Sequence, residues 1–192
     1  MSKPLFLISG ATGATGGHAL KALVAAGQRV RAFVHREDDR SEALKSQGVE
    51  LFVGDFADFR AVRRALEGTT GSYFCYPIAP GIVQAAAHWA QASKEAGSGT
   101  IVNMSQVIAR SDAGSNASLQ HWLSERVFDG FGVPMVHLRP TFFTEWLLYM
   151  APMIAGGTIY ASYDKGKAAL VAAEDQGRVI ASILQNPDEH SG

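Results

Sequence analysis

Three glycines near the amino end of the chain have the spacing of a phosphate-binding turn. Gly10, Gly13 and Gly16 stand in the segment GATGATGG, directly after the apolar run Leu5–Ile8. A buried strand, a glycine turn and a helix start form the setting in which backbone N–H groups bind a pyrophosphate. The first glycine permits the tight turn, the second lets the phosphates approach, and the third lets the helix pack on the strand. An ordinary glycine-rich turn is the alternative, but the setting predicts a dinucleotide site formed by Gly10, Thr12, Gly13, Ala14, Thr15 and Gly16.

Two residues beyond the glycine turn stand where dinucleotide-binding proteins distinguish NAD from NADP. An acidic residue about 20 positions beyond the glycines would hydrogen-bond the adenosine ribose and favour NAD. This chain has His35 and Arg36 there, and an arginine can hold a 2′-phosphate through two parallel hydrogen bonds. We therefore predict NADP as the cofactor, with NADPH preferred over NADH. The alternative is a solvated arginine that is screened by the acidic run Glu37–Asp39.

Apolar and helical segments alternate along the chain, which predicts βαβ units. Strands are expected at Leu5–Ile8, Arg29–Val34, Val49–Val53, Ser72–Tyr76, Thr100–Met104 and Val133–Leu138. Helices are expected at His18–Ala26, Ser41–Gln47 (with Ser41 as its cap), Arg60–Glu67, Ile82–Ala96 and Leu119–Phe131. This alternation indicates an α/β Rossmann fold, a doubly wound parallel sheet covered by helices on both faces. The nucleotide is expected at the carboxyl ends of the strands, where the order reverses between the first and the fourth.

The alternation loosens beyond the sixth strand, which predicts two unequal parts. Residues 1–140 are expected to form the NAD(P)-binding Rossmann domain, and residues 141–192 a small appendage on the substrate side, packed on the same domain. Within the appendage we expect a helix at Phe142–Met150, a loop with short extended pieces at Pro152–Lys167 and a final helix at Glu174–Gln185.

The overall composition is that of a folded domain with no strong charge. Apolar residues make up 47% of the 192 positions and charged residues 18%, and the net charge is −1. Such a balance gives no electrostatic footprint for nucleic acid or for an anionic membrane. A single cysteine, Cys75, excludes a disulfide framework within the chain. We expect a cytoplasmic protein with neither a metal site nor a membrane span.

Several segments, taken in order, resemble the NmrA-like family, an atypical branch of the short-chain dehydrogenase/reductases. The glycine turn has the spacing GxxGxxG in place of the commoner GxGxxG. VGDF (Val53–Phe56), CYPIAP (Cys75–Pro80), VNMSQ (Val102–Gln106) and LRPTFFTEWL after the sixth strand are similar to family segments in the same order. The resemblance covers Leu5 to about Leu148 and implies a Rossmann domain that binds NAD(P).

The same resemblance implies roles for individual residues around the cofactor. Asp55 and Phe56 are expected to lie against the adenine, and the loop with Tyr76 and Pro77 to border the nicotinamide. Phe143, just after the sixth strand, either lines the nicotinamide side or packs in the core.

The catalytic pair of the superfamily, Tyr-x-x-x-Lys, is absent from its usual helix, where Ala117 and His121 take its places. His121 is expected to hydrogen-bond the nicotinamide ribose or to donate a proton; the alternative is a half-buried helix residue paired with a backbone carbonyl. Ser105, at the end of the fifth strand, either orients a substrate carbonyl or caps the loop after that strand. A Tyr-x-x-x-Lys string at Tyr163–Lys167 lies beyond the sixth strand, so we do not expect it to be the pair.

These features predict an NADPH-dependent oxidoreductase that transfers hydride to a small electron-poor acceptor of the quinone or carbonyl type. Quinones suit a site without the tyrosine, because their reduced oxygens need less proton assistance. The alternative is a non-catalytic NADP(H) sensor that acts through a protein partner. An epimerase is disfavoured, because those relatives keep the Tyr-Lys pair. Since relatives continue into a covering lobe, we expect a substrate pocket that is open or completed by another copy in a homo-oligomer.

Overall fold

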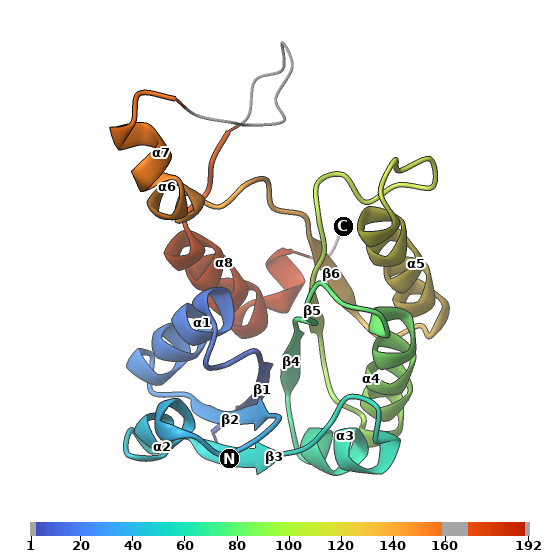
Figure 1. Ribbon diagram of the computed structural model, residues 1–192. Coiled ribbons are helices and arrows are strands. Elements are labelled where there is room, and N and C mark those ends of the chain that lie inside the picture. The colour runs from blue at the N-terminus through green and yellow to red at the C-terminus, as the bar shows by residue number, and fades with distance from the viewer. Residues whose placement is uncertain (1–2, 159–168, 191–192) are drawn as a thin grey trace.

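A six-stranded parallel sheet forms the centre of the molecule (Figure 1). The computed structural model describes residues 3–158 and 169–190. The strands are β1 (Leu5–Ser9), β2 (Arg29–Val34), β3 (Glu50–Val53), β4 (Gly71–Phe74), β5 (Ile101–Met104) and β6 (Met135–Leu138). They run in the order β3-β2-β1-β4-β5-β6, so the order reverses between β1 and β4, as predicted. The carboxyl ends of those two strands therefore meet at the switch point where this fold binds its ligand.

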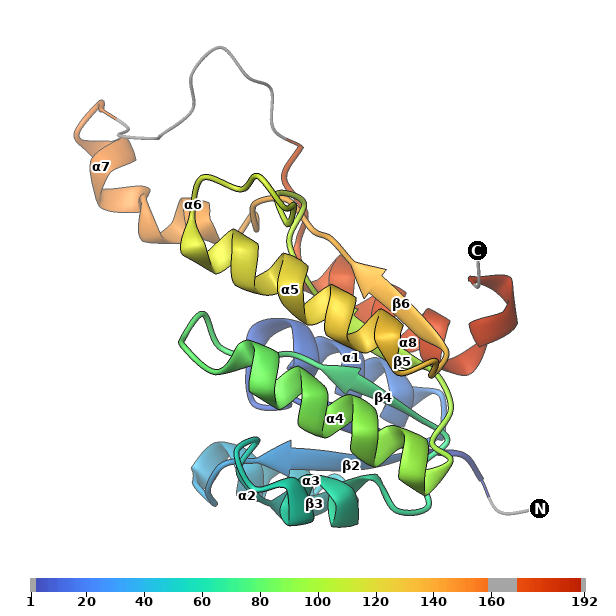
Figure 2. The same ribbon diagram turned by 90° about the vertical axis from the view of Figure 1, so that its right-hand side faces the viewer.

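Helices cover both faces of the sheet. On one face lie α1 (Ala14–Ala25), α2 (Asp39–Lys45) and α8 (Ala173–Gln185), and on the other lie α3 (Phe59–Leu66), α4 (Ile82–Ala96) and α5 (Asn116–Gly130). Figure 2 shows α4 and α5 packed next to each other across the second face. The doubly wound fold is therefore confirmed. No helix in residues 3–158 or 169–190 is long and apolar enough to cross a membrane.

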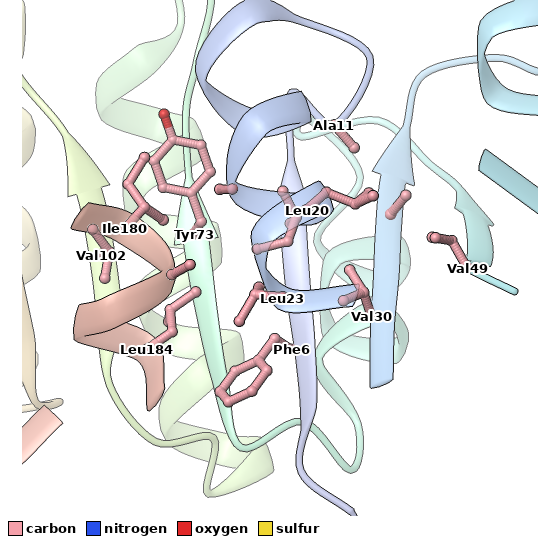
Figure 3. Packing of buried hydrophobic residues seen from close by; sticks show 14 of the residues in the cluster. Phe6, Ala11, Leu20, Leu23, Val30, Val49, Tyr73, Val102, Ile180 and Leu184 are labelled. Carbon is pink, nitrogen blue, oxygen red and sulfur yellow. The ribbon is translucent and has the colours of Figure 1, made fainter. Parts of the chain in front are cut away.

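Each strand of the sheet centre contributes side chains to two cores. Phe6 and Ile8 pack with α1 and α8, in the cluster shown in Figure 3, whereas Leu7 packs in the cluster beneath α3, α4 and α5. A strand buried on both faces has no polar side to alternate with, which explains why β1 is a continuous apolar run. The second core is rich in aromatic rings, and Trp89 at its centre is fully buried.

The C-terminal helix α8 is part of the first core. Ile180 and Leu184 pack against the sheet beside Tyr73 (Figure 3). Gly177 allows α8 to cross α1 closely, because a Cβ there would lie 2.4 Å from the Cβ of His18. The helix therefore completes the cover of the sheet.

Several helix boundaries differ from prediction because of local capping. Helix α1 begins at Ala14 and not at His18, since Gly13 is its N-cap. Helix α2 is capped by Asp38 and not by Ser41. The Asp38 carboxylate accepts from the backbone N–H of Ser41 at 3.1 Å, and the Ser41 hydroxyl accepts from the N–H of Asp38 at 2.8 Å. This reciprocal capping box starts the helix two residues earlier than expected.

The segment after β6 also differs from prediction. Phe143 pairs with Val171 in a bridge, and the N–H of Thr144 donates to the Val171 carbonyl at 3.1 Å, so Phe142 and Phe143 are not helical. The expected helix therefore shrinks to α6 (Trp146–Tyr149), and α7 (Ala151–Ala155) forms where a loop was expected. Tyr163–Lys167 lies outside the described residues.

Candidate cofactor groove and active site

The glycine turn has the geometry that its spacing predicts. Gly10 has a φ of 60°, a left-handed conformation that L side chains rarely adopt. The N–H of Gly13 donates to the Gly10 carbonyl at 2.9 Å, and a Cβ on Gly16 would lie 2.4 Å from that same carbonyl oxygen. Among the described residues, no side chain caps α1. The N–H groups of its first turn therefore remain available to an anion.

Beneath the turn, Thr15 points into the protein. Its hydroxyl lies 2.9 Å from the Tyr73 hydroxyl, and both side chains are buried. The predicted contact of Thr15 with a cofactor is therefore limited to its backbone. Cys75 packs against Gly10, and burial raises the pKa of its thiol. A thiol of raised pKa is a poor nucleophile, which agrees with a packing role.

A groove of about 340 Å³ runs from the glycine turn to the start of α2. It brings together six of the residues predicted to bind the cofactor: Gly10, Thr12, His35, Arg36, Phe56 and Pro77. Asp55 stands beside it, with a carboxylate oxygen 3.6 Å from Nδ1 of His35.

Arg36 is an exposed cation of this groove. Within the described residues it has no hydrogen bond or ion pair, whereas its acidic neighbours Glu37 and Asp38 each pair with another cation. The Asp38 carboxylate accepts from Nη2 of Arg40 at 2.7 Å, which lowers the pKa of Asp38. Glu37 lies 3.8 Å from Nζ of Lys45. Arg40 also lines the groove, although it was not among the residues predicted to bind the cofactor.

A second space, the hollow, has a volume of about 330 Å³ and lies between the loop after β4 and the start of α5. Its lining residues are Pro77, Ile78, Ala79, Pro80, Gly81, Ile82, Asn116, Ala117, Gln120 and His121. Pro77 also lines the groove, so the two spaces adjoin there. Tyr76 supports the wall from behind, since its hydroxyl donates to the Pro80 carbonyl at 3.1 Å.

His121 is buried at the edge of the hollow, with 5% of its surface exposed. Its Nδ1 has no hydrogen-bond partner. The alternative of a ring paired with a backbone carbonyl is therefore not found among the described residues. Burial lowers the pKa of His121, although the nearby charge of Glu125 opposes this effect. The ring is accordingly neutral at pH 7.

Ser105 belongs to a partly buried ionic cluster that the sequence did not reveal, in which Glu125 is buried and Arg139 is exposed. Its hydroxyl donates to Oε1 of Glu125 at 2.6 Å, and Arg139 donates to the same carboxylate through Nε at 2.8 Å and Nη2 at 2.5 Å. Burial acts to raise the pKa of Glu125, but the hydrogen bonds from Arg139 and Ser105 lower it below its usual value. The Ser105 proton is thus committed to Glu125, which leaves its oxygen as an acceptor.

Phe143 lies apart from these spaces. It is half-buried and lines neither the groove nor the hollow. No group of three or more His, Cys, Asp and Glu side chains in the described part of the chain is placed to hold a metal ion.

Comparisons with known proteins agree with this architecture. A model of the NmrA-like family matches residues 2–192. A solved NADPH-dependent quinone oxidoreductase of Escherichia coli, complexed with NADPH, is 22% identical with a TM-score of 0.85, and the match covers 95% of this chain and 65% of that one. The triphenylmethane reductase of Citrobacter sp., complexed with NADP(H), is 20% identical with a TM-score of 0.82, over 95% of this chain and 66% of that one. Sterol demethylase protein B of Methylococcus capsulatus is 45% identical over 67 residues, which are 35% of this chain and 20% of that protein. The chain therefore spans about two thirds of the length of the two solved structures.

Proposed function

The chain belongs to the NmrA-like family, and from this premise we propose that it is an NADPH-dependent oxidoreductase whose acceptor is a small quinone. One observation carries the proposal. The groove beside the glycine turn adjoins the hollow beside His121 at Pro77, at the carboxyl edge of the sheet. This arrangement suits a dinucleotide whose phosphates lie at the turn and whose reactive end lies at Pro77, where the groove meets the hollow.

The residues present fit NADPH. A Cβ on Gly13 would lie 3.1 Å from the Gly10 carbonyl oxygen, so the turn is tight at this position. A glycine here also leaves no side chain in the way of a pyrophosphate. Arg36, which is free of ion pairs among the described residues, suits the 2′-phosphate, with His35, Asp55 and Phe56 on the adenosine side. When bound, NADPH supplies the hydride and becomes NADP⁺, and the quinone takes up that hydride and one proton to give the hydroquinone.

The side chains near the hollow assist in different ways. His121 is neutral at pH 7 and offers a ring nitrogen to the ribose or to the acceptor. Ser105 is buried and lines neither the groove nor the hollow, so it acts by orienting Glu125, to which its hydroxyl donates. With no tyrosine at position 117, proton delivery falls largely to water, which favours a quinone over a ketone.

The proposal is tested by titrating the protein with NADPH and then following the loss of reduced-nicotinamide absorbance with a panel of quinones, aldehydes and ketones. We expect NADPH binding and oxidation by quinones. Gly13→Val, which places a branched side chain at the phosphates, should abolish NADPH binding while the fold survives. Gly114→Val is the matched control, because a Cβ there meets nothing within 4 Å. Tight NADPH binding without oxidation by any acceptor would overturn the enzyme proposal in favour of a sensor.

A further inference from the structure

Hydrogen bonds within the loop after β4 shape the wall of the hollow. The Tyr76 hydroxyl holds the Pro80 carbonyl at 3.1 Å, and the N–H of Ala79 donates to the Pro77 carbonyl at 2.8 Å. Gly81, at a φ of 109°, turns the chain into α4. A preformed concave wall loses little conformational entropy on binding, which is a property of small-molecule sites.

The lining of the hollow is apolar along its loop wall and polar along α5, where Asn116, Gln120 and His121 lie. Its loop wall is built of proline, isoleucine and alanine, and its lining contains no Asp, Glu, Lys or Arg. Asn116 and Gln120 are uncharged, so they offer an ion no counter-charge. An ionised ligand would lose hydration here without gaining a counter-charge, so the hollow disfavours ions.

The two ring nitrogens of His121 differ in their surroundings. Nδ1 is buried from solvent and has no hydrogen-bond partner. Nε2 is not fully buried, and it makes no hydrogen bond within the described residues. Burying an N–H group without a hydrogen-bond acceptor costs more free energy than burying an unpaired nitrogen lone pair. The proton of the neutral ring therefore resides on Nε2, so Nε2 is the hydrogen-bond donor of a residue that lines the hollow. The low pKa that burial gives His121 agrees with this neutral form.

We propose that the hollow is the acceptor site and binds a flat, uncharged ring whose carbonyl oxygen accepts a hydrogen bond from Nε2 of His121. The ring lies against the wall from Pro77 to Pro80. This inference rests on the proposed function for its reaction, but the binding itself requires no hydride. His121 then acts as a neutral donor that polarises the carbonyl.

Ala117 sets the size of the site. It lies one helical turn before His121 on the same face of α5, and both line the hollow. Its methyl group leaves open the space that a larger side chain would fill. Substitution at this position is therefore the most direct way to close the hollow without touching the groove.

The test measures binding of duroquinone, a fully methylated ring that cannot add a thiol, by isothermal titration with and without NADP⁺. Ala117→Phe should weaken duroquinone binding at least tenfold and leave the dissociation constant of NADPH unchanged. Ala43→Phe, on the exposed side of α2, is the matched control and should change neither constant. Ala117→Leu replaces the phenylalanine variant if that variant does not fold.

Two further measurements probe the chemistry of the site. Loss of the hydrogen bond in His121→Leu should weaken duroquinone about three- to tenfold, and His121→Gln, which keeps an N–H donor, should recover most of it. An analogue with one methyl replaced by carboxylate should bind at least tenfold more weakly than duroquinone.

The outcomes separate this inference from the proposed function. If Ala117→Phe weakens NADPH and leaves duroquinone unchanged, the hollow holds the nicotinamide and the inference is wrong. If the variant changes neither constant, the hollow is not a binding site. If the wild type binds duroquinone in the hollow but does not bind NADPH, the site stands and the oxidoreductase proposal fails.

Discussion

Replacing Arg36 by alanine tests the proposed cofactor preference at a single position. The side chain is exposed, lines the groove and has no ion pair or hydrogen bond within the described residues. Its removal breaks no contact in the fold, so the free energy of unfolding should change by no more than about 0.5 kcal/mol. A hydrogen bond to a charged group contributes about 1.5–3 kcal/mol. Affinity for NADPH should therefore fall about ten- to 150-fold, and affinity for NADH, which lacks the 2′-phosphate, should stay the same.

The assay is a fluorescence titration of the wild type and the variant with each reduced cofactor at two salt concentrations. Arg29→Ala is the matched control, because it removes the same charge at the opposite end of β2. It should leave the ratio of the two affinities intact. The reasoning is refuted if Arg36→Ala keeps the NADPH-to-NADH ratio of the wild type. If only Arg40→Ala removes the preference, Arg40 is the phosphate ligand and releases Asp38 to bind it.

Three further predictions concern the fold and the ionisation of the site. Gly177→Ala should lower the free energy of unfolding, measured by urea melts, by about 1–3 kcal/mol, because its Cβ would lie 2.4 Å from the His18 Cβ. Gly130→Ala is the control and should not destabilise the protein, because a Cβ there meets nothing within 4 Å. Because the pKa of His121 is lowered, the folded ring takes up its proton only below the usual value of 6.5. Stability should then be fully present above pH 6.5 and decline as the pH falls below it, and His121→Gln should lack that part of the decline. Quinone turnover should stay level as the pH rises through 6.5, whereas a fall would indicate a charged His121 that donates its proton.

The sequence predicted the sheet and the glycine turn because their determinants are local. The apolar run of β1 and the spacing of Gly10, Gly13 and Gly16 specify a strand, a turn and a helix within a dozen residues. The segment after β6 was less predictable, because its backbone is held by Val171, which is distant in the chain. Local helical preference at Phe143 was overridden by that bridge.

The candidate site was predictable only in part, for a related reason. The positions of Arg36 and His121 follow from the motif and the family pattern. Asp38 caps α2 and pairs with Arg40, and the sequence alone did not predict this pairing. The position of Arg40 in the groove was therefore not predicted. The cluster around Glu125 joins the ends of β5 and β6 to α5, and nothing in the local sequence around Ser105 or Arg139 marks their meeting.

Because α8 packs across α1, the core beneath them can be completed only after α8 has been synthesised. The ribosome releases β1 and α1 first, yet Ala19 and Leu20 share their core with Ile180 and Leu184. Until α8 has emerged, the part of this face that α8 covers, over β4 and β5, stays exposed to solvent. Contacts between segments so distant along the chain form late and slow folding. The nascent chain therefore exposes an apolar surface through most of its translation, which is the state in which chaperones are needed most.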